Sequence, residues 1–274
     1  MAHVGYWDLF TLAAALLTTG VIAGLVAGLL GVGGGIVIVP VLYFMFDLIG
    51  VAPNVNMHCA VGTSLATILA TGTSSSYSHV KRGGVDGPLL RQWGLPIVIG
   101  VLSGSVLAGL VSGQVLIGVF GVIVLVVAVN MAFKNKRSSL ADQLPGTPWR
   151  QIIGFFIGGF SVMMGIGGGT LGVPTLTLFN YPIRRAVGTS AVIGLIIAVP
   201  GTLAAIYFGW GEAGRPPYSL GYVNVIGFLL IIPASVLLAP VGAKLAHTIK
   251  PQLLDRLFAL FLLITGLKML SDVL

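Results

Sequence analysis

The chain has 274 residues, of which 56% are hydrophobic and only 8% are charged. A soluble domain averages about 25% charged residues, because a surface in water requires them. The 14 Lys and Arg and 7 Asp and Glu residues are too few to cover a globule of this size. Together with the mean hydropathy of +1.04 and the 40 glycines, they indicate that lipid surrounds most of the surface.

Charge and cysteine usage exclude several classes of protein. The net charge of +7 does not indicate nucleic-acid binding, because the basic residues sit between apolar runs, where the positive-inside rule accounts for them. A single cysteine, Cys59, excludes an internal disulfide framework and a cysteine-based metal cluster. We expect no metal and no other cofactor. The first apolar run begins near Leu9 without a basic residue before it, which favours a retained span over a signal peptide.

Ten apolar segments follow along the chain. A helix needs about 20 apolar residues to cross a bilayer. The candidate segments cover residues 9–31, 34–47, 59–80, 93–111 and 115–133 and, after a polar linker at 134–150, residues 151–166, 170–180, 186–209, 220–241 and 253–272. Three of them, 34–47, 151–166 and 170–180, are too short to cross comfortably and adjoin glycine runs, which favours half-helices or re-entrant hairpins. The prediction is an all-α membrane protein with about ten transmembrane or half-membrane helices.

The positions of Lys and Arg predict the orientation. With the linker and its basic residues in the cytoplasm, alternation of sides places twelve basic residues inside: Lys81, Arg82, Arg91, Lys134, Lys136, Arg137, Arg150, Arg184, Arg185, Lys244, Lys250 and Arg256. Only Arg215 and Lys268 fall outside. The sequence therefore predicts a multi-pass protein of the plasma membrane, the inner membrane of a bacterium, with both termini outside.

Two motifs occur once in each half of the chain. GVGGGIVIVP at Gly31–Pro40 and GIGGGTLGVP at Gly165–Pro174 match at six of ten positions, and AVGTS recurs identically at 60–64 and 186–190. The two motif pairs are 134 and 126 residues apart, and the difference of eight predicts a longer loop around 53–57. Five segments in each half is an odd number, so the second half is expected to be inverted. We predict two inverted five-segment repeats, at 1–140 and 141–274, an architecture typical of transporters.

The glycine runs are the first candidate site. Backbone that leaves helical geometry at membrane depth must face protein or water. One interpretation is that N–H groups at the break coordinate an anion at the start of a half-helix. The other is a tight turn with close helix packing. The candidate binding residues are Gly33, Gly34, Gly35, Gly167, Gly168 and Gly169, joined by the hydroxyls of Thr63, Ser64, Thr189 and Ser190, which can instead bond to their own helix.

Ionisable residues near the spans are few. His58 precedes the first AVGTS and can titrate near neutral pH, and His79 lies at the end of the same segment. Arg184 and Arg185 open the eighth segment, either as positive-inside anchors or as groups that draw anions toward the site. These four are candidates for ion coupling or for substrate access. No acid lies in the middle of a span, which disfavours a carboxylate relay for cations or protons.

The doubled GxGGGxxxVP element with a downstream GTS in each half resembles the TauE/SafE family of sulfite exporters. The resemblance spans essentially the whole chain. It implies export, or uptake, of a small anion such as sulfite, a sulfonate or a related organic or sulfur oxyanion. Thr170 stands where the first run has Ile36, so this hydroxyl is a further candidate ligand that makes the two half-sites unequal.

The leading hypothesis is a secondary transporter that moves a small anion by alternating access, with a proton or sodium as possible coupling ion. An anion channel and a non-transporting scaffold subunit are the alternatives. An intramembrane enzyme is disfavoured, because one cysteine and four scattered histidines offer neither a nucleophile nor a metal cluster. The substrate identity, the direction of transport and the oligomeric state stay open.

Overall fold

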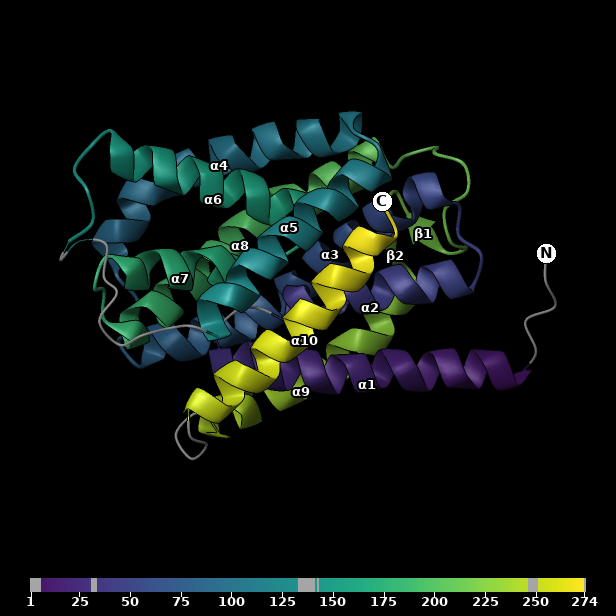
Figure 1. Ribbon diagram of the computed structural model, residues 1–274, viewed down its shortest axis with the longest axis horizontal. Coiled ribbons are helices and arrows are strands. Elements are labelled where there is room, and N and C mark those ends of the chain that lie inside the picture. The colour runs from purple at the N-terminus through teal and green to yellow at the C-terminus, as the bar shows by residue number, and fades with distance from the viewer. Residues whose placement is uncertain (1–5, 31–33, 133–140, 142, 246–250, 274) are drawn as a thin grey trace.

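The computed structural model describes residues 6–30, 34–132, 141, 143–245 and 251–273. Ten helices and one two-stranded hairpin make up this part of the chain (Figure 1): α1 (Tyr6–Leu30), α2 (Gly35–Leu48), α3 (Pro53–Lys81), α4 (Gly87–Leu110), α5 (Gly113–Ala132), α6 (Trp149–Met163), α7 (Gly169–Leu178), α8 (Ile183–Phe208), β1 (Ser219–Leu220), β2 (Val223–Asn224), α9 (Val225–Leu245) and α10 (Pro251–Ser271). Each predicted segment corresponds to one helix, which confirms the all-α prediction. Helices α4, α5, α8 and α9 are long and apolar enough to cross a membrane.

Several helices begin earlier than the apolar runs predict. Helix α3 begins at Pro53 and α4 at Gly87, because proline near the first position and the Asp86 side chain, which accepts the Leu89 N–H, start a helix irrespective of hydropathy. The predicted ninth segment, by contrast, becomes helical later than expected. Its first residues form the antiparallel β1–β2 hairpin, and α9 begins only at Val225.

The prediction of a longer loop around 53–57 is wrong, because these residues are helical. The loops 49–52 and 179–182 have the same length. The eight extra residues lie in the helices instead: α2 has 14 residues and α7 has 10, while α3 has seven residues before Ala60 (53–59) and α8 has three before Ala186 (183–185). Each difference is four residues, or about one helical turn.

Helices of the two halves pack against one another in matching pairs. Helix α1 lies parallel to α9, where a Cβ on Gly20 or Gly24 would lie 2.5 Å from the carbonyl of Ile231 or Ser235. Helix α4 lies parallel to α6 in the same manner, with Gly100 against the carbonyl of Phe155. The remaining large contacts join α3 to α8 and α5 to α10. The small residues therefore serve close helix approach, as predicted for membrane helices.

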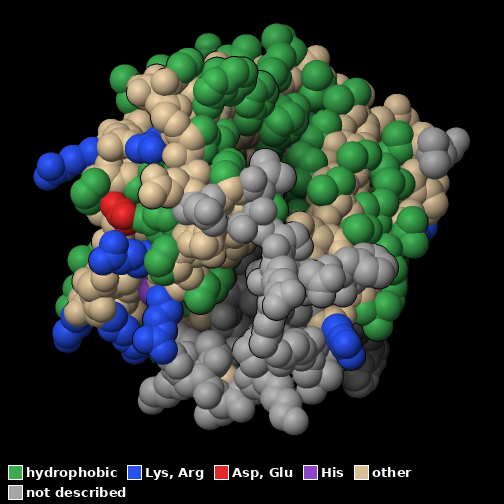
Figure 2. All heavy atoms as spheres, turned by 60° about the vertical axis from the view of Figure 1, so that its left-hand side comes forward, with side chains coloured by type: hydrophobic (Ala, Val, Ile, Leu, Met, Phe, Trp, Pro, Cys, Tyr) green, Lys and Arg blue, Asp and Glu red, His purple; other side chains and the backbone are tan. Residues whose placement is uncertain are grey.

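Most of the described basic residues gather at one end of the bundle. The end of α3 and the starts of α4, α6 and α8 meet there, as shown by the hydrogen bonds from the Asp86 N–H to Thr189 Oγ1 (3.0 Å) and from Arg150 to Gln92 (2.6 Å). We call this the basic end; Figure 2 shows its cluster of blue side chains. The opposite, hairpin end carries β1–β2 and Arg215. Lys134, Lys136, Arg137 and Lys250 lie outside the described residues, and the side of the membrane that each end faces stays a prediction.

Candidate functional site

The second glycine run contains the end of α6 and the start of α7. Gly165 has a φ of +65°, a conformation that side chains with a Cβ rarely adopt. Its N–H donates to the Val162 carbonyl and the Ile166 N–H donates to the Ser161 carbonyl, which is the Schellman arrangement that ends a helix. The first glycine of the motif is therefore a helix terminator. The break ends α6 after 15 residues, as expected for a half-length helix.

The two glycine breaks meet inside the molecule. Helix α2 lies right of the centre in Figure 1 and α7 lies left of it. At the start of α2, a Cβ on Gly35 would lie 2.7 Å from the carbonyl oxygen of Gly165 and 3.0 Å from the Cα of Ile166. The Ser64 hydroxyl, from the first AVGTS, donates to the same Gly165 carbonyl at 2.7 Å. We call this meeting point of Gly35, Gly165 and Ser64 the glycine junction.

The start of α7 packs closely against α8, at and just after the second AVGTS. A Cβ on Gly168 would lie 2.4 Å from Ile193 Cγ2, and one on Gly172 would lie 2.7 Å from Ser190 Oγ. Thr170 and Ser190 are 3% and 0% exposed, and their hydroxyls have no hydrogen-bond partner in the described part of the chain. A buried polar group without a partner costs about 1–3 kcal/mol, so such groups often mark a place for a ligand or a water.

The two half-sites are unequal. In the first half, the Ser64 hydroxyl donates a hydrogen bond to the Gly165 carbonyl, whereas the hydroxyl of its counterpart Ser190 has no described partner. Gly34, with a φ of +76°, precedes α2, and its carbonyl accepts the first helical hydrogen bonds of α2. Gly33 lies outside the described residues. Gly167 and Gly169 complete the second break, with the Gly167 carbonyl accepting the Thr170 N–H at 3.4 Å. Close packing therefore explains why Gly35 and Gly168 are glycines. Anion coordination by the N–H groups of the glycine runs stays a prediction.

The threonines of the two AVGTS motifs join the halves. Thr63 Oγ1 accepts the backbone N–H of Asn224, at the start of α9, at 2.8 Å. Thr189 Oγ1 accepts the backbone N–H of Asp86, at the start of α4, at 3.0 Å. Asn224 and Asp86 in turn cap their own helices through the Gly227 and Leu89 N–H groups. Each motif thus holds the fourth helix of the other half.

Asp86 has further partners at the basic end. Its second carboxylate oxygen accepts the Tyr181 hydroxyl, and both residues line a cleft of about 340 Å³. Burial raises the pKa of the Asp86 carboxyl, but the hydrogen bonds from Tyr181 and Leu89, with Arg185 nearby, outweigh burial and hold this pKa below its usual range. The pKa of Tyr181 is raised, by burial and by its hydrogen bond to Asp86.

Replacing Asp86 by alanine is expected to lower the free energy of unfolding by about 1–2 kcal/mol through loss of the helix cap. Asp86→Asn is expected to cost less, because asparagine caps α9 at Asn224. Since the pKa of Asp86 is lowered on folding, its charge stabilises the fold above the unfolded-state pKa of about 4 and ceases to do so as the pH falls through the folded-state pKa. The melting temperature of the detergent-solubilised protein, measured against pH, tests this. In Asp86→Asn the melting temperature should fall less steeply as the pH is lowered below about 4. Asp47→Asn is the control, because the Asp47 side chain is exposed at the end of α2.

The predicted ionisable residues lie at opposite ends. His58 is at the hairpin end, where its Nε2 contacts the Ala108 carbonyl at 3.0 Å. His79 is at the basic end, and a Cβ on Gly84 would lie near the carbonyls of both His79 and Arg184. Arg184 and Arg185 are exposed at the start of α8. The structure therefore does not bring these four residues together. Sequence reasoning also missed Asn224 as a partner of Thr63, although its position just before an apolar run is a signal for a helix cap.

Comparison with known proteins decides the family. A family profile described as sulfite exporter TauE/SafE matches residues 16–269. The chain belongs to the TauE/SafE family. Three relatives are each named probable membrane transporter protein: one of Haemophilus influenzae is 33% identical over 95% of this chain and 99% of its own length, one of Methanocaldococcus jannaschii is 28% identical over 93% and 94%, and one of Bacillus subtilis is 28% identical over 94% and 97%. No solved structure matches the chain significantly.

Membership of the TauE/SafE family confirms the resemblance found in the doubled motifs. It identifies a multi-pass membrane transporter, in agreement with the apolar helices. The family is one of transporters rather than enzymes.

Proposed function

We propose that the protein is a secondary transporter that moves a small anion, such as sulfite, a sulfonate or a related organic or sulfur oxyanion, across the plasma membrane by alternating access. The observations that carry this proposal are the glycine junction, where the broken helices of both halves meet, and the buried hydroxyls of Thr170 on α7 and Ser190 on α8, which have no partner in the described part of the chain. The family's description as sulfite exporters supports the substrate class.

The chemistry of the site favours an anion over a cation. Hydroxyl groups can donate hydrogen bonds to an oxyanion, and the start of α7 adds the positive end of a helix dipole. Asp86 lies near Ser190, because its backbone N–H bonds to Thr189, but its two carboxylate oxygens already accept hydrogen bonds from the Leu89 N–H and the Tyr181 hydroxyl. An oxyanion beside Thr170 and Ser190 would give both hydroxyls the acceptor that the described protein atoms do not supply.

The mechanism rests on two inverted repeats, residues 1–140 and 141–274. The paired packing of α1 on α9 and α6 on α4 supports this division, as do the exchanged contacts of Thr63 with Asn224 and Thr189 with Asp86. Inverted repeats allow one bundle to rock against the other around a fixed central site. In this proposal the basic end faces the cytoplasm, both termini lie outside, and a proton or sodium is the coupling ion.

Thermal stabilisation of the purified protein by sulfite, sulfate, thiosulfate, taurine, sulfoacetate and simple carboxylates tests the site. A ligand that binds only the folded state raises the apparent stability by RT ln(1 + [L]/Kd), about 2.7 kcal/mol at one hundred times Kd. Thr170→Val and Ser190→Ala are each expected to remove most of this stabilisation and to slow anion uptake into liposomes at least tenfold (~1.4 kcal/mol), the low end for a hydrogen bond to a charged group.

Thr175→Val is the matched control, because Thr175 lies on the same helix and its hydroxyl already donates to the Leu171 carbonyl at 2.6 Å. The control should bind and transport as the unmodified protein does. If no anion shifts the melting temperature, or if Thr175→Val is as damaging as Thr170→Val, the proposed site is wrong. Flux at channel-like rates that ignores imposed ion gradients would favour the channel alternative.

A further inference from the structure

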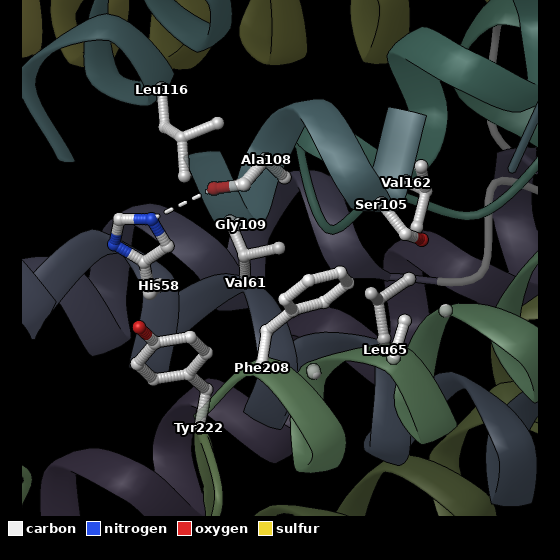
Figure 3. Close-up of a pocket in the computed structure, with 13 residues that line it drawn as sticks. His58, Val61, Leu65, Ser105, Ala108, Gly109, Leu116, Val162, Phe208 and Tyr222 are labelled. Atoms are coloured by element: carbon white, nitrogen blue, oxygen red, sulfur yellow. Dashed lines mark hydrogen bonds between the residues drawn. The ribbon is translucent and has the colours of Figure 1, made fainter. Parts of the chain in front are cut away.

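A small cavity lies between the hairpin end and the glycine junction. Its volume of about 30 Å³ is enough for a water molecule or two. Residues of α3, α4, α5, α6, α8 and the hairpin line it, among them His58 and Tyr222 at one side and Leu65 and Val162 at the other (Figure 3). Val61 also lines it, and a Cβ on Gly165 would lie 2.7 Å from the Cα of Val61. The cavity therefore adjoins the glycine junction.

His58 is the residue of this cavity whose side chain ordinarily titrates near neutral pH. Its side chain is 8% exposed, and the imidazole lies against the Tyr222 ring, with centroids 5.0 Å apart. Nε2 lies 3.0 Å from the Ala108 carbonyl oxygen, as the dashed line in Figure 3 shows. Because a carbonyl can only accept, Nε2 must carry the hydrogen, and in the neutral ring Nδ1 then holds the free lone pair. Nδ1 is buried without a hydrogen-bond partner in the described part of the chain.

The surroundings of His58 favour reversible protonation of its imidazole. Ala108 lies in the last turn of α4, where the negative end of the helix dipole favours a cation. The titratable and charged groups near the ring are Tyr222 on the hairpin, Glu212 and Arg215 in the loop before it, and Cys59 beside it on α3. The described lining from α4, α5, α6 and α8 is uncharged.

The internal repeat gives His58 a counterpart. Aligning the AVGTS motifs places His58, two residues before Ala60, on Arg184, two residues before Ala186. Arg184 lies at the basic end and carries a permanent charge, whereas His58 lies at the hairpin end and is charged only when protonated. At equivalent positions of the repeat, the basic end therefore carries a permanent positive charge at Arg184, and the hairpin end carries one at His58 only when that ring is protonated.

We propose that His58 binds the proton that accompanies the anion, which makes the cavity a proton-binding site coupled to the glycine junction. A proton from the aqueous side adds to the Nδ1 lone pair, and the resulting imidazolium keeps its Nε2–H bond to Ala108. Ser64 lies six residues further along α3, about 9 Å by helical rise, so the charge favours an anion at the junction. This inference rests on the proposed transport of an anion.

The test measures anion affinity against pH for the unmodified protein, His58→Gln and His79→Gln, with sulfate, thiosulfate and sulfite as probes. In the unmodified protein and in His79→Gln, Kd is expected to rise by up to about tenfold per pH unit above the pKa of His58, because one proton and one anion bind together. In His58→Gln this dependence disappears. Sulfite titrates in this range by itself, so for sulfite only the difference between the unmodified protein and His58→Gln counts.

A second measurement keeps His58 in place and so does not depend on the His58→Gln variant. With His3, His79 and His247 replaced by Gln, NMR of the remaining His58 ring reports its protonation directly. Adding whichever of sulfate, thiosulfate or sulfite binds should raise the pKa of His58 by at least half a unit. An anion that binds while the His58 pKa stays constant, or a pH dependence unchanged in His58→Gln, would overturn the inference and leave the proposed function intact. If no probe binds at any pH, the proposed function fails and the coupling fails with it.

Discussion

Gly165→Ala is expected to abolish most of the folded protein, whereas Gly83→Ala is expected to cost only about 1–2 kcal/mol, the penalty for a Cβ in the left-handed conformation. The two glycines are a matched pair. Both have a φ of +65° and both follow a helix end with the same pair of capping hydrogen bonds. The backbone strain of the substitution is therefore the same at both positions.

The difference lies in the space around each glycine. A Cβ at Gly83 would meet nothing within 4 Å, whereas a Cβ at Gly165 would lie 2.7 Å from Val61 Cα and 2.9 Å from the Val61 carbonyl oxygen. These are backbone atoms that cannot rotate away, so α6 and α3 would have to separate and the Ser64 bond to the Gly165 carbonyl would be lost. Size-exclusion profiles and melting temperatures in detergent measure the effect. Equal melting temperatures for the two variants would contradict the packing of the glycine junction.

Thr63→Val and Thr189→Val are expected to lower the free energy of unfolding by about 1–3 kcal/mol each, because valine keeps the shape of threonine but leaves a backbone N–H without its acceptor. The loss should be larger for Thr63, since its bond to the Asn224 N–H is fully buried and the bond of Thr189 to Asp86 is partly exposed. Transport should fall in both variants, because each bond joins one half of the molecule to the other.

Chemical denaturation or melting of the two single variants and the double variant checks this expectation. The two bonds share no partner, so their effects should add to within about 0.5 kcal/mol. Thr73→Val is the control, because the Thr73 hydroxyl lies exposed on α3 and donates to the Leu69 carbonyl of its own helix. If Thr73→Val lowered the stability as much as Thr63→Val, the loss would come from replacing a threonine hydroxyl in general and not from breaking the hydrogen bond between the halves.

Much of the fold follows from local properties of the sequence. Long apolar runs with few charges predict the helices, because lipid requires backbone groups to pair within one segment. The helix boundaries at Pro53 and Gly87 escaped the hydropathy pattern, since capping and proline geometry, not hydropathy, start these helices. The extra turn before Ala60 was misassigned as a loop because Pro53, Asn54 and Asn56 interrupt the apolar pattern, although Val55, Asn56 and Met57 are buried in the folded protein.

The sequence by itself determined the membrane class, the ten segments, the doubled motifs and the family, since composition and motifs are visible without any contact between distant residues. Only the tertiary structure decided that Gly35 meets Gly165, and that Ser64 is committed to the Gly165 carbonyl while Ser190 is free among described partners. Two identical AVGTS motifs cannot reveal this difference, because the partner of a hydroxyl is set by which backbone the packing of helices brings within about 3 Å.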